Sequence, residues 1–235
     1  MTEINCNGDI FDYYQEFARS GFADMLHDTE RNHKYAMALK ESIERTQQSG
    51  KKARVLDIGT GSGLLAMLAA RYGADSVVTI EAYSPVTNVA REIILKNGFK
   101  DKIKMINKHS TKVTVGPGLD MEQKANILVA EVFDTELIGE GAIWTYRKAH
   151  ENLMEEDCMC VPHSASVYVQ IVESDLAASW YEFKDFLVDG EKILTAPKNV
   201  RFKLILGIEI DDFPFRFHNV RVLKLSTTFN LVNIH

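Results

Sequence analysis

The sequence predicts an α/β fold built on a doubly wound, mostly parallel sheet, and two observations predict it. Between residues 54 and 130, short apolar runs typical of buried strands alternate with segments whose apolar residues recur at helical spacing. The first of these runs, residues 54–58, breaks into a turn with three glycines and continues as an apolar helix. Because such a turn lets the backbone approach a ligand closely, it predicts a nucleotide-type ligand site.

The remaining elements are predicted in order along the chain. Short helical patterns cover residues 12–19 and 22–27, and a longer helix opens at Asp28 or Thr29 with Tyr35, Leu39 and Ile43 on one apolar stripe. Strands are expected at 54–58, 77–81, 103–106 and 126–130, joined by right-handed crossovers. The second crossover helix has Ser84 as its N-cap and Pro85 at its first position, and its expected buried residues are Val86, Val89, Ala90, Ile93 and Ile94.

Past Pro162 the pattern becomes β-rich, with strand-like runs at 166–172, 202–210 and 220–225. A closed barrel would be tight in the length that remains. We therefore predict three parts: N-terminal covering helices in residues 1–50, a ligand-binding domain in 51–161, and an incomplete β-rich domain in 162–235.

Composition limits the class of protein. The chain has 235 residues, 46% of them hydrophobic, and a formal charge of -6 without a long basic run, so nucleic acid and membrane are poor first guesses for a partner. The polar N-terminus and three cysteines predict a reducing compartment, which we take as cytoplasm and nucleus. Cys158 and Cys160 could form half of a metal site, but because no second cysteine pair exists we expect structural thiols and no metal.

The spacing of the glycines indicates which ligand the turn binds. A dinucleotide site reads G-x-G-x-x-G, whereas here Gly59, Gly61 and Gly63 alternate and Asp57 stands two residues before them. This spacing is similar to the S-adenosylmethionine loop of class I methyltransferases, which have a Rossmann-like sheet. A generic glycine-rich turn or a degenerate NAD site, as in an oxidoreductase, is the alternative.

Two acidic positions flank this turn. Glu81 ends the second strand, where a doubly wound fold places the carboxylate that binds ribose hydroxyls. Glu131 ends the fourth strand, which neighbours the first strand in the usual order. The loop 131–141 holds four carboxylates, and a loop that acidic beside a sulfonium ligand predicts a cationic acceptor.

Several segments resemble the protein arginine methyltransferase family, and specifically its monomethylating type III subfamily. Glu131 and Glu140 resemble the family's double-glutamate loop. The other matching segments are Tyr13-Tyr14-Gln15-Glu16-Phe17, Met25-Leu26-His27-Asp28 with Arg31, Asn107-Lys108-His109-Ser110-Thr111, and residues 133–141. The resemblance implies methyl transfer from S-adenosyl-L-methionine to arginine in histones or arginine-glycine-rich proteins, and dimerisation as an option.

The resemblance also implies the role of each residue. Glu131 and Glu140 would clamp the guanidinium, Arg31 would pair with the methionine carboxylate of the cofactor, and Met25 would pack over the sulfonium. Along the rest of the cofactor, Asp57, Gly59 and Gly61 would form the loop, Glu81 would hold the ribose, and Ser110 would meet the adenine.

One feature of the family pattern is not found in this sequence. Family members complete the active site with a His-Trp loop from the C-terminal barrel, whereas the tryptophans here, Trp144 and Trp180, do not come directly after a histidine. Two hypotheses remain: an active arginine methyltransferase, or a truncated or alternatively spliced form that binds cofactor but is silent and acts as a regulatory partner.

Overall fold

A computed structural model describes residues 22–134, 137–169, 184–195 and 225–230. The helix expected at 12–19 and the strand expected at 202–210 lie outside these residues. The chain divides into two compact units, each described here by itself. Among described residues, the first unit holds 22–132 and 141–164, and the second holds the loop that ends at Glu140 and nearly all of the residues after 164.

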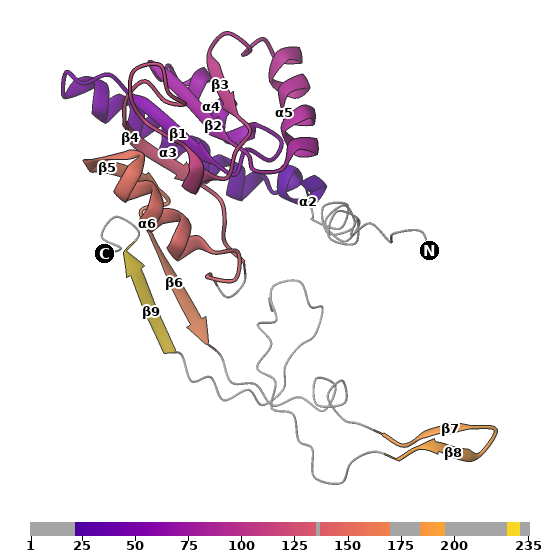
Figure 1. Ribbon diagram of the computed structural model, residues 1–235. Coiled ribbons are helices and arrows are strands. Elements are labelled where there is room, and N and C mark those ends of the chain that lie inside the picture. The colour runs from indigo at the N-terminus through magenta and orange to yellow at the C-terminus, as the bar shows by residue number, and fades with distance from the viewer. Residues whose placement is uncertain (1–21, 135–136, 170–183, 196–224, 231–235) are drawn as a thin grey trace. The chain divides into compact units, whose positions relative to one another are not determined.

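The first unit is built on a five-stranded sheet whose pairings are all parallel (Figure 1). Its strands, in the order β3-β2-β1-β4-β5, are β1 (Arg54–Ile58), β2 (Ser76–Ile80), β3 (Ile103–Ile106), β4 (Ala125–Ala130) and β5 (Met154–Val161). Since β1 lies between β2 and β4, the strand order reverses there. In doubly wound sheets the ligand crevice opens at this point, at the carboxyl ends of the strands.

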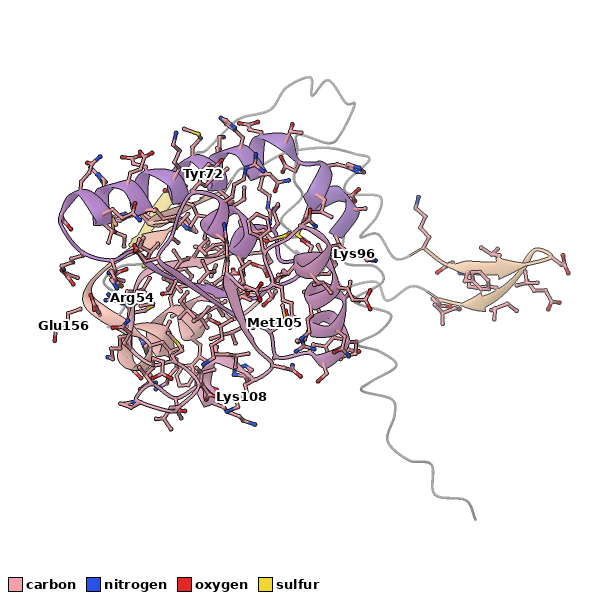
Figure 2. The ribbon with its side chains drawn as sticks, turned by 90° about the horizontal axis from the view of Figure 1, so that it is seen from above. Arg54, Tyr72, Lys96, Met105, Lys108 and Glu156 are labelled. Carbon is pink, nitrogen blue, oxygen red and sulfur yellow. The ribbon has the colours of Figure 1, made fainter. Side chains whose placement is uncertain are left out.

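Helices cover the sheet: α2 (Phe22–His27), α3 (Thr29–Gln48), α4 (Leu64–Arg71), α5 (Ser84–Lys96) and α6 (Ala142–Asn152), with a 3-10 turn η1 (Ser110–Lys112) after β3. Asp28 is the N-cap of helix α3, and its carboxylate accepts a hydrogen bond from the Arg31 N–H at 2.9 Å. Its predicted apolar stripe is confirmed: Leu39 and Ile43 are fully buried in the core, and Tyr35 packs against it. Figure 2 shows α3 lying along one face of the sheet, above Tyr72.

Helix α6 and strand β5 were not predicted from the sequence. Helix α6 buries only Ala142, Tyr146 and Ala149, so its apolar stripe is weak. Strand β5 carries three consecutive acidic residues, which are unfavourable in strands. Two of these charges are compensated: Arg54, labelled in Figure 2, pairs with Glu155, and Lys51 pairs with Asp157 at 2.6 Å.

Helix α5 differs from the prediction by about one position. Its N-cap is Tyr83 rather than Ser84, and the Ser84 hydroxyl donates instead to the side-chain oxygen of Asn107 at 2.7 Å. Val89 is 53% exposed although the pattern predicted its burial, and Thr87 is buried instead. The helix therefore presents a slightly rotated face to the sheet.

The regular elements described after residue 164 are all strands. β6 (Ser164–Val169), which overlaps the expected strand 166–172, pairs with β9 (Leu225–Asn230). An antiparallel hairpin, not predicted, joins β7 (Phe186–Val188) to β8 (Glu191–Leu194) through Asp189 and Gly190, both at positive φ. The domain boundaries and the incomplete barrel remain predictions. Within the described residues, no helix combines the length and the apolar character needed to cross a bilayer.

Candidate functional site

The glycine turn joins β1 to α4 at the carboxyl edge of the sheet. Gly59, Gly61 and Gly63 have φ values of 86°, 51° and 84°, which side chains rarely adopt. The turn is also crowded, because a Cβ on Gly61 would lie 3.1 Å from the Phe22 ring, and one on Gly63 would lie 3.0 Å from Ile94 Cγ1. The backbone angles therefore favour glycine at all three positions, and the space favours it at Gly61 and Gly63.

Glu81 follows β2 directly and lies beside this turn. Its Oε2 accepts from the Gly61 N–H at 3.3 Å, and its Oε1 accepts from the Tyr83 N–H at 3.0 Å. Its backbone is fixed as well, because the Glu81 N–H donates to the Ile106 carbonyl and the Asn107 amide donates to the Glu81 carbonyl. The half-buried carboxylate is thus held against the glycine turn, although each oxygen can accept further hydrogen bonds.

Asp57 lies beneath the turn and is completely buried. Its Oδ2 accepts from the Thr79 hydroxyl at 2.7 Å, and the Thr79 and Thr60 hydroxyls lie 2.6 Å apart, whereas its Oδ1 has no hydrogen-bond partner. Burial, with a smaller effect of the Glu81 charge, raises the pKa of Asp57 to about 7. Asp57 therefore connects the sheet to the turn through Thr79 and Thr60, two residues that sequence reasoning missed.

The pairing of β1 with β2 shows which signal in the sequence points to Thr79. Asp57 and Thr79 are direct partners in the parallel pairing of β1 and β2. A threonine hydroxyl directly opposite a buried aspartate indicates a hydrogen bond, but this can be predicted only when the register of the two strands is known.

Arg31, Met25 and Glu131 come together although up to 106 residues separate them in sequence. Arg31 Nη2 lies 2.7 Å from Glu131 Oε2 and 3.8 Å from the Met25 sulfur. Arg31 Nη1 donates to Asn32 Oδ1 at 2.8 Å, and the guanidinium lies 5.5 Å from the centre of the Tyr35 ring. The Arg31 and Glu131 side chains are each 22% exposed, so this ion pair is half-buried.

Tyr35 connects this pair to the end of β4. Its hydroxyl donates to the Ala130 carbonyl at 3.3 Å, and Ala130 is the last residue of β4 before Glu131. Burial raises the pKa of Tyr35 well above its usual value, so the hydroxyl remains a donor. Helix α3 is thereby anchored where Glu131 leaves the sheet.

Glu140 belongs to the second unit, at the end of a loop that Asp134 organises. Asp134 Oδ1 accepts from the Gly139 N–H at 3.1 Å, and the Asp134 carbonyl accepts from the Leu137 N–H at 2.9 Å. A Cβ on Gly139 would lie 1.7 Å from Asp134 Oδ2, so only glycine allows this contact. The next residue after Glu140 is Gly141, the N-cap of α6.

Ser110 opens η1, the short turn that follows β3 at the same edge of the sheet. Its carbonyl accepts from the Val113 N–H at 3.3 Å. The His109 ring at the N-cap lies 2.8 Å from the Thr111 hydroxyl, which agrees with a structural role for this histidine. All seven residues predicted to bind cofactor therefore lie in the first unit.

Comparison with known proteins identifies the relatives of this chain. A family model described as ribosomal protein L11 methyltransferase (PrmA) matches residues 32–139. Protein arginine N-methyltransferase 7 of Anopheles gambiae is 52% identical over 215 residues, covering 89% of this chain and 31% of the relative. The Gallus gallus protein of the same name is 55% identical over 193 residues, covering 81% and 28%. The chain thus spans less than a third of the length of these relatives.

Solved structures agree on the fold. The Trypanosoma brucei PRMT1 enzyme-prozyme heterotetrameric complex with AdoHcy matches with a TM-score of 0.63 and 26% identity, over 75% of this chain and 52% of that chain. Arabidopsis thaliana protein arginine methyltransferase 10 matches with a TM-score of 0.57 and 23% identity, over 66% and 41%. Together with the curated relatives, these matches show that the chain has a Rossmann-like methyltransferase fold and belongs to the protein arginine N-methyltransferase family.

Proposed function

We propose that this chain transfers a methyl group from S-adenosyl-L-methionine to a guanidinium nitrogen of protein arginine. The observation that carries the proposal is the pair between Arg31 and Glu131: at the end of β4, a half-buried carboxylate already binds a guanidinium at 2.7 Å. A substrate arginine presents the same chemical group. Glu131 also stands beside β1, whose carboxyl end opens into the glycine turn.

The residues around that turn support binding of this cofactor. The left-handed glycine backbone lets a ligand lie close, and the fixed Glu81 carboxylate accepts hydrogen bonds from ribose hydroxyls. In this proposal Arg31, with Met25 beside it, provides a guanidinium for the methionine carboxylate, and Ser110 at the start of η1 meets the adenine. The cofactor supplies an electrophilic methyl group, and the relative from Trypanosoma brucei was solved with AdoHcy.

Glu131 and Glu140 act on the acceptor. A guanidinium is protonated at neutral pH and delocalised, so its nitrogens are poor nucleophiles. Two carboxylates that bind it by paired hydrogen bonds fix its plane, concentrate the positive charge away from one terminal nitrogen, and aim that nitrogen at the methyl group. Catalysis is then mainly positioning and electrostatic stabilisation.

The proposal extends to the number of methyl groups transferred, the substrate and the cellular compartment. We infer one methyl per guanidinium, with arginine in histones or arginine-glycine-rich proteins as substrate, in the cytoplasm and nucleus. The acidic loop that ends at Glu140 favours such cationic partners over nucleic acid. Dimerisation is compatible with the proposal, and the match in Trypanosoma brucei is a heterotetramer.

Charge-neutral variants of the two glutamates test the function. We expect Glu131→Gln and Glu140→Gln each to lower transfer of radiolabelled methyl to an arginine-glycine peptide by about 10- to 150-fold, because a charge-assisted hydrogen bond contributes about 1.5 to 3 kcal/mol and is lost at the reacting group. Glu122→Gln, which neutralises an exposed glutamate, is the matched control and should retain wild-type transfer. Wild-type rates in Glu140→Gln would refute the double-glutamate assignment.

The same transfer assay, combined with calorimetry, distinguishes an active enzyme from the second hypothesis, a silent partner that binds cofactor. That hypothesis predicts binding of S-adenosylmethionine by calorimetry with no incorporated label in the wild-type chain. Label incorporated on arginine by the wild-type chain, identified by mass spectrometry of the peptide, would exclude it.

A further inference from the structure

Three side chains with metal-binding atoms meet where α6 packs on β5. His150 lies in the last turn of α6, and Cys158 and Cys160 lie two residues apart on β5, so their side chains share one face of the strand. The sulfur of Cys158 is 3.4 Å from His150 Nδ1, and that of Cys160 is 3.6 Å from His150 Nε2. One ligand atom from each residue lies within 4.8 Å of the other two. All three residues belong to the first unit.

These separations resemble those around a tetrahedral metal ion. With zinc-sulfur bonds of about 2.3 Å and zinc-nitrogen bonds of about 2.0 Å, neighbouring ligand atoms stand about 3.5 Å (nitrogen to sulfur) and about 3.8 Å (sulfur to sulfur) apart. Each ring nitrogen now faces one sulfur, and one nitrogen would serve as the ligand. The limit of 4.8 Å exceeds these tetrahedral separations by about 1 Å, so a small rotation of the imidazole would allow one nitrogen and both sulfurs to bind the same ion.

A disulfide fits this arrangement less well. Two residues apart on an extended strand, the cysteine Cα atoms are roughly 6.6 Å apart, near the upper end of the range that a disulfide spans. The cysteines are not joined in a disulfide and are only 4% and 5% exposed. Two buried thiolates with a neutral imidazole would balance the charge of a divalent cation, whereas without the cation two such charges are costly to bury.

We propose that His150, Cys158 and Cys160 form a binding site for Zn²⁺, with water as the fourth ligand. Zinc favours thiolate and imidazole ligands, and the half-buried His150 leaves one side of the cluster open to solvent. As the two sulfur-zinc bonds form, any thiol protons pass to the solvent. The ion ties the C-terminal turn of α6 to β5, while the other end of α6 begins two residues after Glu140.

The sequence predicted structural thiols here because it contains no second cysteine pair. The third ligand is a histidine on a helix that the sequence pattern did not predict. Among the described residues, this is the one group of three or more His, Cys, Asp or Glu side chains placed to hold a metal ion.

Cobalt substitution tests the site in the whole, reduced chain. Titration with Co²⁺ should produce a thiolate-to-cobalt charge-transfer band and the visible bands of tetrahedral cobalt, saturating at one ion per chain and bleached by Zn²⁺. Cys158→Ala and Cys160→Ala should abolish the charge-transfer band or halve it, and His150→Gln should shift the visible bands and weaken binding at least tenfold. His163→Gln, the matched change at a histidine outside the cluster, should leave spectrum and affinity unchanged.

A second measurement on the wild-type chain avoids any folding defect of the variants. Zn²⁺ should protect Cys158 and Cys160, but not Cys6, from alkylation by iodoacetamide, as read by peptide mass spectrometry. Absence of the charge-transfer band in the wild-type chain, equal alkylation of all three cysteines with and without Zn²⁺, or an unchanged cobalt spectrum and affinity in His150→Gln would each overturn the proposal.

Discussion

At the scale of single residues, Asp57 shows how a buried carboxyl can serve a ligand site without contacting solvent. Its one hydrogen bond, to Thr79, does not compensate for complete burial, so the pKa of Asp57 rises to about 7. The acidic position before the glycines was predicted from the sequence, but the side chain supports the turn from below. The spacing in the sequence does not show whether the Asp57 side chain faces the ligand or lies buried beneath the turn, because its burial depends on the neighbouring strands.

We expect Asp57→Asn to change stability in a pH-dependent way. The folded-state pKa lies above the unfolded value of 3.8, so the folded state holds its proton more tightly, and ionisation destabilises the wild type as pH rises from about 4 to about 7. Asparagine keeps the acceptor for Thr79 and has no charge. The variant should therefore gain stability relative to wild type between pH 5 and pH 8, by a few kcal/mol at most, since one pKa unit equals about 1.4 kcal/mol.

Urea unfolding of both proteins at the two pH values measures this difference, and titration of the other carboxyls cancels in the comparison. If the free energies of unfolding of variant and wild type differ by the same amount at pH 5 and pH 8, Asp57 has the same charge state in the folded and unfolded chain.

At the scale of elements, the glycine turn combines two constraints that can be separated. Gly63 and Gly73 both have a φ of 84°, but a Cβ on Gly63 would meet the buried Ile94 at 3.0 Å, whereas one on Gly73 would meet nothing within 4 Å. Gly73→Ala should thus cost about 1 kcal/mol for the left-handed backbone alone. We expect Gly63→Ala to cost about 1 to 3 kcal/mol more, because the core around Ile94 is packed.

Denaturant unfolding of the two alanine variants gives both values. Equal losses of stability would mean that Ile94 moves aside and that the turn requires glycine for its backbone angles only.

Elements with a strong pattern could be predicted, and those without one could not. The strand of residues 54–58 and the helix carrying Leu39 and Ile43 have apolar residues at a clear period, and both are confirmed. By contrast, β5 is acidic and lies at the edge of the sheet, and α6 buries only three residues. The His150 cluster was missed for the same reason.

At the scale of the whole molecule, the residues proposed to bind the cofactor share one unit, whereas the two glutamates proposed to bind the acceptor are divided between both units. Every residue proposed to bind S-adenosylmethionine lies in the first unit, as does Glu131, while Glu140 lies in the second. Sequence spacing predicted Glu81 beside the turn, and the geometry agrees with it. The contact of Arg31 with Glu131 was not predicted, because it depends on where α3 crosses the end of β4.

Ligand-induced stabilisation tests this division. A ligand at 100 times its Kd stabilises the folded state by about 2.7 kcal/mol, which corresponds to roughly 5 °C or more in Tm for a chain of this size. We expect S-adenosylmethionine to raise Tm by this amount in the wild type and in Glu140→Gln, and by much less in Arg31→Ala, which removes the proposed partner of the methionine carboxylate. Arg45→Ala, an exposed arginine on the same helix, is the matched control.

NADH serves as the second control, because a degenerate dinucleotide site was the alternative interpretation of the glycine turn. A rise in Tm with NADH and none with S-adenosylmethionine would reverse that interpretation. Loss of the S-adenosylmethionine effect in Glu140→Gln would show instead that the second unit contributes to cofactor binding. If both ligands behave as expected, the alternating glycines at 59, 61 and 63 select the sulfonium cofactor, and the chemistry of the acceptor is decided separately by the two glutamates.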